Sequence, residues 1–433
     1  MGARTWLSCS AVLLALLNPA RAADFEIDIE QLSELSPPPS STISADNLGL
    51  YTAFIDRDFA RFVKSGAANL MIGEPLSFPP PDAYIEATTR YRGHARLGDN
   101  PGMLDGYKQG RPFSGALDTN DPKAGTKAAW NMRYAYAGDS SKLAEIRWQM
   151  RDWESTKVQA EMLFEGRSMR LRYRHVQLPG PAITNNPHDA FAAFFMRAVD
   201  AGSYNGTEIL VFANRDGSRP LNGAVYLAQT GRTQTLASFS TEEAMFGSDI
   251  GPSDFLTYSG PRPAQRWRYL GSSFTLLPLY RHDQIDPAAR KAHKHAYWHL
   301  DFGGHSGCFP KVRWQLRPTL ILEATALDPA AVVTRRVFYL DAQTYMPAMW
   351  KIYQGEQQLS KFVINAYAHP DFHMAENRGV GAPILSAASS IDISANRCTS
   401  LQLLTLLNPS DVTAADFGSS DMQNGAGAHS RRH

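Results

Sequence analysis

The strongest constraint on the fold is a run of segments in which apolar and polar residues alternate, because alternation is typical of strands with one buried face. Around Gly166 the alternating apolar residues are Val158, Ala160, Met162, Phe164, Met169, Leu171 and Tyr173. Folding the chain at Gly166-Arg167 puts them all on one face and places Glu161 opposite Arg172 on the other. We therefore predict an antiparallel hairpin over residues 157–174.

The same pattern continues to residue 367, with a few helical segments between the strands. Further strands are predicted at 84–88, 209–213, 224–228, 233–239, 267–270, 320–327, 332–340, 345–353 and 357–367, the last four as a meander. Helical spacing of apolar residues predicts helices at 50–65, 121–130 and 187–202. Asn186 and Pro187 suit the start of the third helix. We expect a mainly β (α+β) fold, in which helices cover one large curved antiparallel sheet.

The first 22 residues have the pattern of a cleavable signal peptide. Arg4 precedes an apolar stretch over 6–17, and Ala20-Arg21-Ala22 provides the small residues of a cleavage site. Cys9 lies inside the apolar stretch, which disfavours its use as a lipid-attachment site. We predict a signal peptide at 1–22, a leader at 23–45, a single β domain at 46–400 and a C-terminal tail at 401–433 that is largely disordered at its end. The predicted location is the periplasm.

Charge and cysteine content narrow the range of partners. Lys and Arg together number 43 against 42 Asp and Glu, which gives no reason to expect a nucleic-acid partner. No segment after the signal peptide is long and apolar enough to cross a membrane, although a peripheral membrane contact is compatible with the sequence. Cys308 and Cys398 remain after cleavage, and the sequence leaves open whether they form a disulfide or two separate thiols.

Histidines are the main candidates for metal chemistry. Asp286-Pro287 begins a predicted helix that carries His293, His295 and His299, with His282 and His305 nearby. His295 and His299 are four residues apart and suit one metal on one helix face. However, no acidic residue lies between them and the third ligand is unspecified, so a basic exposed helix is the simpler interpretation. His369 and His373 flank Pro370, which argues against a shared helix.

Other catalytic signals are weaker still. The sequence has no Gly-x-Ser-x-Gly elbow and no phosphate-binding glycine loop. Carboxylates at 249, 254, 283 and 286 suit acid–base pairs, but loop carboxylates more often cap turns or face water. Arg170, Arg172 and Arg174 form a row that suits either an anion or a solvated outer sheet face.

Aromatic residues in and beside the predicted strands suggest a cavity. A curved sheet with few covering helices encloses more space than its own side chains fill, and the remainder becomes an apolar pocket. Sealing an acyl chain there is favourable by roughly 0.8 kcal/mol per methylene. For a lipid tail the sum is on the order of ten kcal/mol, enough to carry it through water. Core filling is the alternative role for any single aromatic residue.

Several short segments, in order over 84–355, resemble a known family. They are Tyr84-Ile85-Glu86-Ala87-Thr88, Asp105-Gly106-Tyr107, Gly110-Arg111-Pro112-Phe113, Ala128-Ala129-Trp130-Asn131, Arg133-Tyr134, Ala224-Val225-Tyr226-Leu227, Gly231-Arg232, Ser253-Asp254-Phe255, Trp267-Arg268-Tyr269-Leu270-Gly271, Glu323-Ala324-Thr325, Arg336-Val337-Phe338-Tyr339-Leu340-Asp341 and Thr344-Tyr345. They resemble the exported Gram-negative domain-of-unknown-function family thirteen-twenty-nine, which is related in fold to the LolA/LolB lipoprotein carriers. The segment 282–310 looks like an expansion, and the tail is peculiar to this chain.

The resemblance implies a LolA-like half-barrel with a hydrophobic cavity and a helical lid. It also implies a role near the outer membrane, beside export pumps of the resistance-nodulation-division type. The family offers no catalytic residues to carry over.

The leading hypothesis is a periplasmic carrier or binding protein for a lipid or other hydrophobic molecule, with no cofactor and no covalent chemistry. The candidate ligand-binding residues are Met162, Phe164, Leu171, Tyr173, Tyr226 and Trp267. Two alternatives remain: a metal-dependent hydrolase that uses the His cluster, and an accessory subunit that docks on an outer-membrane or export-pump protein through its aromatic sheet edge.

Overall fold

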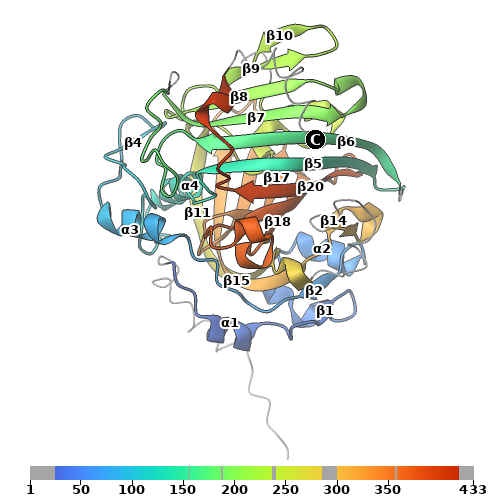
Figure 1. The fold of residues 1–433 in the computed structure, drawn as a ribbon. Helices are drawn as coiled ribbons and strands as arrows, with labels where there is room; N and C mark the ends of the chain where they lie inside the picture. Colours follow the sequence, from blue (N-terminus) through green and yellow to red (C-terminus); the bar gives the residue numbers. More distant parts are fainter. Residues whose placement is uncertain are drawn as a thin grey trace, which may run out of the picture.

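One large sheet organises the chain (Figure 1). The computed structural model describes residues 25–155, 157–186, 189–236, 240–284, 300–355 and 358–418. Sixteen strands join in the order β1-β2-β15-β16-β17-β18-β19-β20-β5-β6-β7-β8-β9-β10, with β11 paired to β15 and β12 to β18. Their bounds are β1 (Thr42–Ile43), β2 (Leu70–Ile72), β5 (Ser140–Asp152), β6 (Val158–Arg170), β7 (Ala190–Asp200), β8 (Glu208–Asn214), β9 (Asn222–Leu227), β10 (Arg232–Thr235), β11 (Gln265–Leu277), β12 (Leu279–Tyr280), β15 (Arg313–Ala326), β16 (Val333–Asp341), β17 (Pro347–Gln354), β18 (Gln358–Ala368), β19 (Ile384–Asp392) and β20 (Arg397–Leu407).

Nearly all neighbouring strands are antiparallel, and among the described residues only the β2–β15 and β12–β18 pairs are parallel. The predicted mainly β class with a large antiparallel sheet is confirmed, as are the meander β15–β18 and the strands β8, β9, β10 and β11. Two short separate ladders pair β3 (Arg96–Leu97) with β4 (Leu104–Asp105) and β13 (Phe302–Gly303) with β14 (Phe309–Pro310).

Two runs of hairpins, β5–β10 and β15–β20, join through one long-range pairing. β20 lies beside β5, with Leu401 opposite Trp148. Because these strands are about 250 residues apart in sequence, only the tertiary structure could reveal that the two runs form one sheet. β20 also carries the sheet past residue 400, where the sequence placed the start of a tail.

The described α-helices are short. Their bounds are α1 (Ile29–Leu35), α2 (Phe59–Lys64), α3 (Asp82–Arg90) and α4 (Ala124–Arg133). The helix predicted near 121–130 is therefore confirmed as α4, shifted by a few residues. The segment 23–45, expected as a leader, contains α1 and β1, and Leu32 of α1 is fully buried against the sheet.

Two predictions in the N-terminal part were wrong. The strand expected at 84–88 is helix α3, in which Tyr84, Ala87 and Thr88 are buried at i, i+3 and i+4 on one helix face. The single helix expected at 50–65 is broken, and only α2 is an α-helix within it. Asp56 causes the break, because its Oδ1 accepts from the backbone N–H groups of Asp58 and Phe59, at 3.0 Å each, and starts a new helix there.

The hairpin predicted at 157–174 was also wrong, because β6 runs straight through Gly166. Its register pairs Phe164 with Ile146 on β5, and Glu161 binds Arg147 of β5 instead of Arg172. A Cβ at Gly166 would lie 3.0 Å from the carbonyl oxygen of Phe195 on β7. Gly166 thus marks a close approach of two strands rather than a turn.

The helix predicted at 187–202 is strand β7. Phe194 faces one side of the sheet, where its ring lies 5.9 Å from that of Phe255. Phe195 faces the other side, where the guanidinium of Arg167 lies 4.6 Å from its ring centroid. Both faces of β7 are therefore covered, so its sequence lacks the polar–apolar alternation of a half-exposed strand and imitates helical spacing.

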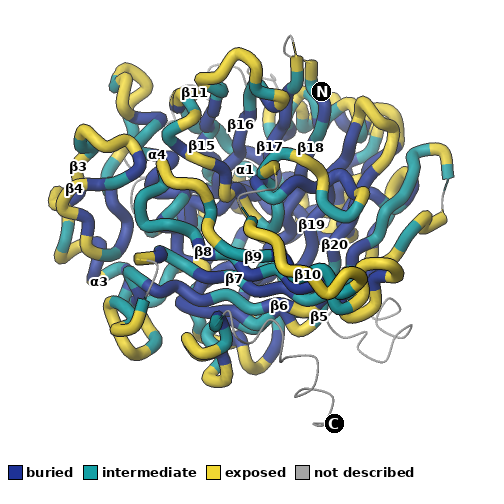
Figure 2. The backbone as a smooth tube through the Cα atoms, turned by 90° about the horizontal axis from the view of Figure 1, so that it is seen from above, coloured by how far each residue is buried: buried dark blue, intermediate teal, exposed yellow. Residues whose placement is uncertain are grey.

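The outer face of β15–β20 is covered by the N-terminal segment and by residues 300–312. The strands of this half of the sheet are accordingly mostly buried, dark blue in Figure 2. Lys351 of β17 binds Asp56 and Asp58 at 2.9 and 3.0 Å, and Phe59 packs on Phe362 of β18. Cys308 and Cys398 form a disulfide with a Cα–Cα distance of 5.9 Å, which resolves the open question in favour of the bond. It ties this cover to the central strand β20.

The expected signal peptide (1–22) and the end of the tail (419–433) lie outside the described residues. Among the residues that the structure does describe, no helix is both long and apolar enough to span a membrane.

Candidate functional site: the interior of the curved sheet

The inner side of the sheet is filled by part of the same chain, residues 240–264, which we call the inner segment. It connects β10 to β11 and contains only three short 3-10 turns: Met245–Gly247, Pro252–Asp254 and Arg262–Ala264. Its side chains or carbonyls contact residues of β11, β16, β17, β18, β19, β20, β5, β6 and β7. A flat sheet spanning these strands would be about 40 Å wide. One short segment reaches them all because the sheet curves around it.

Aromatic and aliphatic contacts make up most of this interior. Phe255 stacks on Trp148 of β5 with ring centroids 5.5 Å apart, and Phe246 lies 5.0 Å from Phe164 of β6. Met245, Ile250 and Leu256 pack into the same cluster. The inner segment thus occupies the space in which the sequence predicted an empty apolar cavity.

A buried ion pair fixes the middle of the inner segment. Arg336 of β16 donates from Nε to Asp254 Oδ1 at 3.0 Å and from a terminal nitrogen to Asp254 Oδ2 at 2.7 Å. The same guanidinium binds Glu242 at 2.5 Å, and Trp350 Nε1 donates to Asp254 at 2.9 Å. Burial by itself would lower the pKa of Arg336, but the adjacent Asp254 and Glu242 carboxylates outweigh burial and raise it.

A second anchor lies at Asp249, which is almost fully buried. Arg397 of β20 donates to its carboxylate at 2.5 Å and Thr399 at 2.8 Å, while Lys361 of β18 donates to its backbone carbonyl at 2.8 Å. Burial raises the pKa of Asp249, and the hydrogen bond from Thr399 and the charge of Arg397 offset only part of that rise. Asp249 and Asp254, considered above as acid–base candidates, are therefore bound to arginines of the sheet.

Helix α4 covers the remaining inner surface beside β11. A Cβ at Gly125 would lie 2.5 Å from backbone atoms of Trp267 and Arg268, so only glycine lets the helix approach the strand this closely. At the other end of α4, Arg133 donates to the carbonyl of Asn214 on β8 at 2.8 Å. The helix thus bridges the two sides of the curved sheet. The implied helical lid corresponds to α4, but most of the cover is the non-helical inner segment.

The six predicted ligand-binding residues fall into separate places. Met162, Phe164 and Trp267 face the inner side: the first two share one apolar cluster, and the Trp267 ring lies 6.0 Å from that of Tyr258. Leu171 and Tyr226 belong to a different cluster on the outer face, with Phe417. The ring of Tyr173 lies 4.8 Å from that of Tyr107 and 5.4 Å, edge-on, from that of Tyr134 beside the end of α4. The structure brings only the first three to the interior.

Of the predicted metal ligands, His293, His295 and His299 lie outside the described residues, as does Asp286. His282 is buried beside the hydroxyl of Tyr280 at 3.1 Å, whereas His305 contacts the carbonyl of Trp153. Within the described ranges, no group of three or more His, Cys, Asp or Glu residues is arranged to hold a metal ion.

The row of arginines at 170, 172 and 174 is not a solvated outer sheet face. Arg170 and Arg174 are buried, and only Arg172 is partly exposed, where it pairs with Asp189. β6 ends at Arg170, so the three side chains do not share a strand. Asp283 pairs with Arg281 at 2.7 Å.

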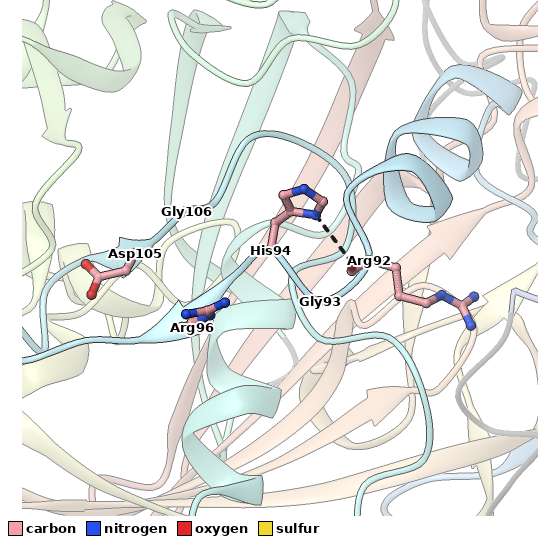
Figure 3. Close-up of a pocket in the computed structure, with 6 residues that line it drawn as sticks. All are labelled: Arg92, Gly93, His94, Arg96, Asp105 and Gly106. Atoms are coloured by element: carbon pink, nitrogen blue, oxygen red, sulfur yellow. Dashed lines mark hydrogen bonds between the residues drawn. The ribbon is translucent and has the colours of Figure 1, made fainter.

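A polar surface pocket lies apart from this interior, at the β3–β4 pair (Figure 3). Its volume is about 420 Å³, and Arg92, Gly93, His94, Arg96, Asp105 and Gly106 line it. Arg92 and Asp105 project to opposite sides, and His94 Nδ1 contacts the carbonyl of Arg92 at 3.4 Å. None of the predicted ligand-binding residues lies there.

Fold and interior together define an open, strongly curved antiparallel β-sheet protein whose hollow side is closed by its own chain. A model of the DUF1329 family, a protein family of unknown function, matches residues 42–423, so the chain belongs to this family and the predicted family assignment is confirmed. No curated protein matches the chain.

The chain is also similar to solved structures. A DUF1329 family protein from Desulfovibrio piger has a TM-score of 0.48 and 15% sequence identity, over 70% of this chain and 100% of that one. A domain described as an outer membrane lipoprotein-sorting protein from Vibrio parahaemolyticus has a TM-score of 0.46 and 13% identity, over 70% and 100%. A LolA superfamily protein from Nitrosomonas europaea has a TM-score of 0.37 and 9% identity, over 67% and 94%.

Proposed function

We propose that this protein is a periplasmic carrier or binding protein for a lipid or another hydrophobic molecule, and that residues 245–256 of the inner segment are a displaceable cover over the binding surface, whereas Tyr258 and Arg262 stay in place beside β11 and α4. One observation carries the proposal: apolar side chains of the inner segment, above all Phe246 and Phe255, lie against Phe164 and Trp148 as a bound acyl chain would. Displacing the segment exposes a continuous apolar wall formed by several strands.

The free energy lost when the apolar side chains of the cover are withdrawn is comparable to the free energy gained when a lipid chain takes their place. Withdrawing five large apolar side chains of the inner segment costs about 2 kcal/mol each, or roughly 10 kcal/mol in total. A sixteen-carbon chain gains about 0.8 kcal/mol per methylene, or roughly 13 kcal/mol, by taking their place. Breaking the Asp254–Arg336 ion pair adds about 3–5 kcal/mol to the cost. The exchange is therefore close to balanced for a sixteen-carbon chain and unfavourable for a short apolar molecule.

The periplasmic location is supported by two independent features. The first 22 residues have the pattern of a signal peptide, and the Cys308–Cys398 disulfide is of a kind that persists in oxidising compartments. Cell fractionation tests this part: recovery of the processed protein in the cytoplasmic fraction would contradict it.

Binding is tested with delipidated protein and vesicles of radiolabelled phosphatidylethanolamine and phosphatidylglycerol. After re-isolation, we expect protein-bound label well above that of an unrelated soluble protein. Phe164→Leu and Phe195→Leu form a matched pair, because the same change is made on neighbouring strands that face the interior and the outer side respectively. We expect only Phe164→Leu to alter lipid uptake. Equal effects of both variants, or no label above the control, would refute the proposal.

A further inference from the structure

Three side chains beside α4 carry hydrogen-bond donors without acceptors. Arg262 is only 8% exposed, and its Nε donates a long bond of 3.4 Å to the carbonyl of Ala129, while its terminal nitrogens have no partner among the described residues. The hydroxyl of Tyr258, a residue 3% exposed, is buried without a partner. The Nε of Arg133 is a second buried donor without a partner. Buried polar groups are normally satisfied, so these two donors beside the unpaired guanidinium of Arg262 need an explanation.

The same place has an uncompensated positive charge. In the part of the chain that the structure describes, no carboxylate pairs with Arg262 or Arg133. Among the carboxylates of the inner segment, Asp254 and Glu242 are already bound to Arg336, and Asp249 is bound to Arg397. Burial, together with the neighbouring charge of Arg133, lowers the pKa of Arg262 to about 9, which still leaves it a cation at neutral pH. Burying such a charge is unfavourable unless an anion accompanies it.

This cationic group lies directly beside the apolar interior. Trp267 Nε1 donates to the backbone carbonyl of Arg262 at 3.0 Å. The ring of Tyr258 lies 6.0 Å from that of Trp267 and 5.1 Å from that of Phe338, both on the inner face. A molecule with an acidic end and an apolar chain would therefore place the acidic end at the cationic group and the chain in the apolar interior next to it.

We propose that Arg262, Tyr258 and Arg133 form a binding site for the acidic group, a carboxylate or phosphate, of an amphiphilic lipid whose chain lies in the apolar interior. This rests on the proposed carrier function and adds the chemical class of the ligand. Charge-assisted hydrogen bonds from guanidinium groups are the usual means of binding such oxyanions. The competing explanation is structural: Arg262 is a cation near the C-terminal end of α4, where helices favour positive charge.

The test compares cis-parinaric acid with its methyl ester, which has the same chain and no charge, by fluorescence titration of delipidated protein. We expect the acid to bind about 10- to 100-fold more tightly, the range for hydrogen bonds to charged groups. Equal binding of acid and ester would overturn the anion site and leave the carrier function intact. Binding of neither would refute the carrier function itself. Competition by millimolar inorganic phosphate or acetate alone, without lipid binding, would show a site for free anions and contradict the lipid assignment.

Two substitutions test which residues cause the preference for the acid over the ester. Arg262→Met should remove most of the preference for the acid and keep binding of the ester, and Tyr258→Phe, which deletes only the hydroxyl, should lower the preference a few-fold. Arg268→Gln is the matched control, because Arg268 is 68% side-chain exposed and pairs with Glu323. Thermal unfolding distinguishes the anion site from the structural role. If Arg262 is buried without an anion in the ligand-free protein, Arg262→Met leaves that protein equally or more stable. A clear loss of stability with an unchanged acid preference would establish the structural role and overturn the proposal.

Discussion

Asp254→Asn tests whether the inner segment is a cover, since it removes one charge and almost no volume. Asp254 accepts two hydrogen bonds from Arg336 and one from Trp350, and its side chain is 9% exposed. Removing one partner of a buried ion pair costs about 3–5 kcal/mol. Arg336 keeps Glu242, and an asparagine oxygen still accepts from Trp350, so we expect a loss of about 2–3 kcal/mol.

This loss has an unusual consequence for binding. If the ligand binds only after residues 245–256 are displaced, destabilising the closed state raises the population of the binding-competent state by the same free energy. The variant should therefore unfold at a lower urea concentration and yet bind parinaric acid about 30- to 160-fold more tightly, as long as the closed state still predominates. Hydrogen exchange of peptides covering residues 245–258 should accelerate by a similar factor.

The control is Asp121→Asn, which removes a surface ion pair with Lys127 at the start of α4. Such pairs contribute little, so neither stability nor affinity should change measurably. If Asp254→Asn lowers stability while affinity falls or stays the same, residues 245–256 are a fixed part of the core and not a cover.

Three further results are expected. Burial would raise the pKa of Asp139, but the adjacent His175 side chain and hydrogen bonds from the backbone N–H groups of residues 175–177 hold it at about 2. The stability that the ionised carboxylate adds is present above about pH 4 and lost as pH falls towards 2. Urea titrations should therefore give wild type an advantage of about 2 kcal/mol over Asp139→Asn at pH 7 that vanishes near pH 2. Replacing Cys308 and Cys398 by serine should cost about 2–4 kcal/mol, given their separation of 90 residues, whereas an unchanged melting temperature would contradict this. Gly125→Ala should lower the unfolding free energy by about 1–3 kcal/mol despite the better helix propensity of alanine, because its Cβ meets the β11 backbone; an increase in stability would disprove the close contact.

Strand prediction succeeded where one face of the sheet differs from the other in polarity or where turn residues separate the strands. The meander β15–β18 was predicted almost in full, because Asp328-Pro329 and the turns at 341–344 and 354–356 mark its hairpins. Prediction failed at β7, where Phe194 and Phe195 are covered on opposite faces. It failed at Gly166 because a close approach of strands and a turn both call for glycine.

The candidate site was predicted only in part. Alternation correctly suggested that Met162 and Phe164 face an apolar interior, but it also assigned Leu171 and Tyr226 there, and these lie on the outer face. Nothing in the local sequence around Arg262 or Arg336 distinguishes a buried guanidinium from a surface one. Their burial depends on partners far away in the sequence.

Local alternation, turn chemistry and short ordered segments are enough to predict the secondary-structure class, the family and most hairpins of the second half. Tertiary structure decided that β5 pairs with β20, that the sheet curves, and that residues 240–264 fill its hollow side. The physical reason is that a strand's partner and a loop's resting place are set by the packing of surfaces contributed by distant segments, and no local pattern records which surfaces will meet.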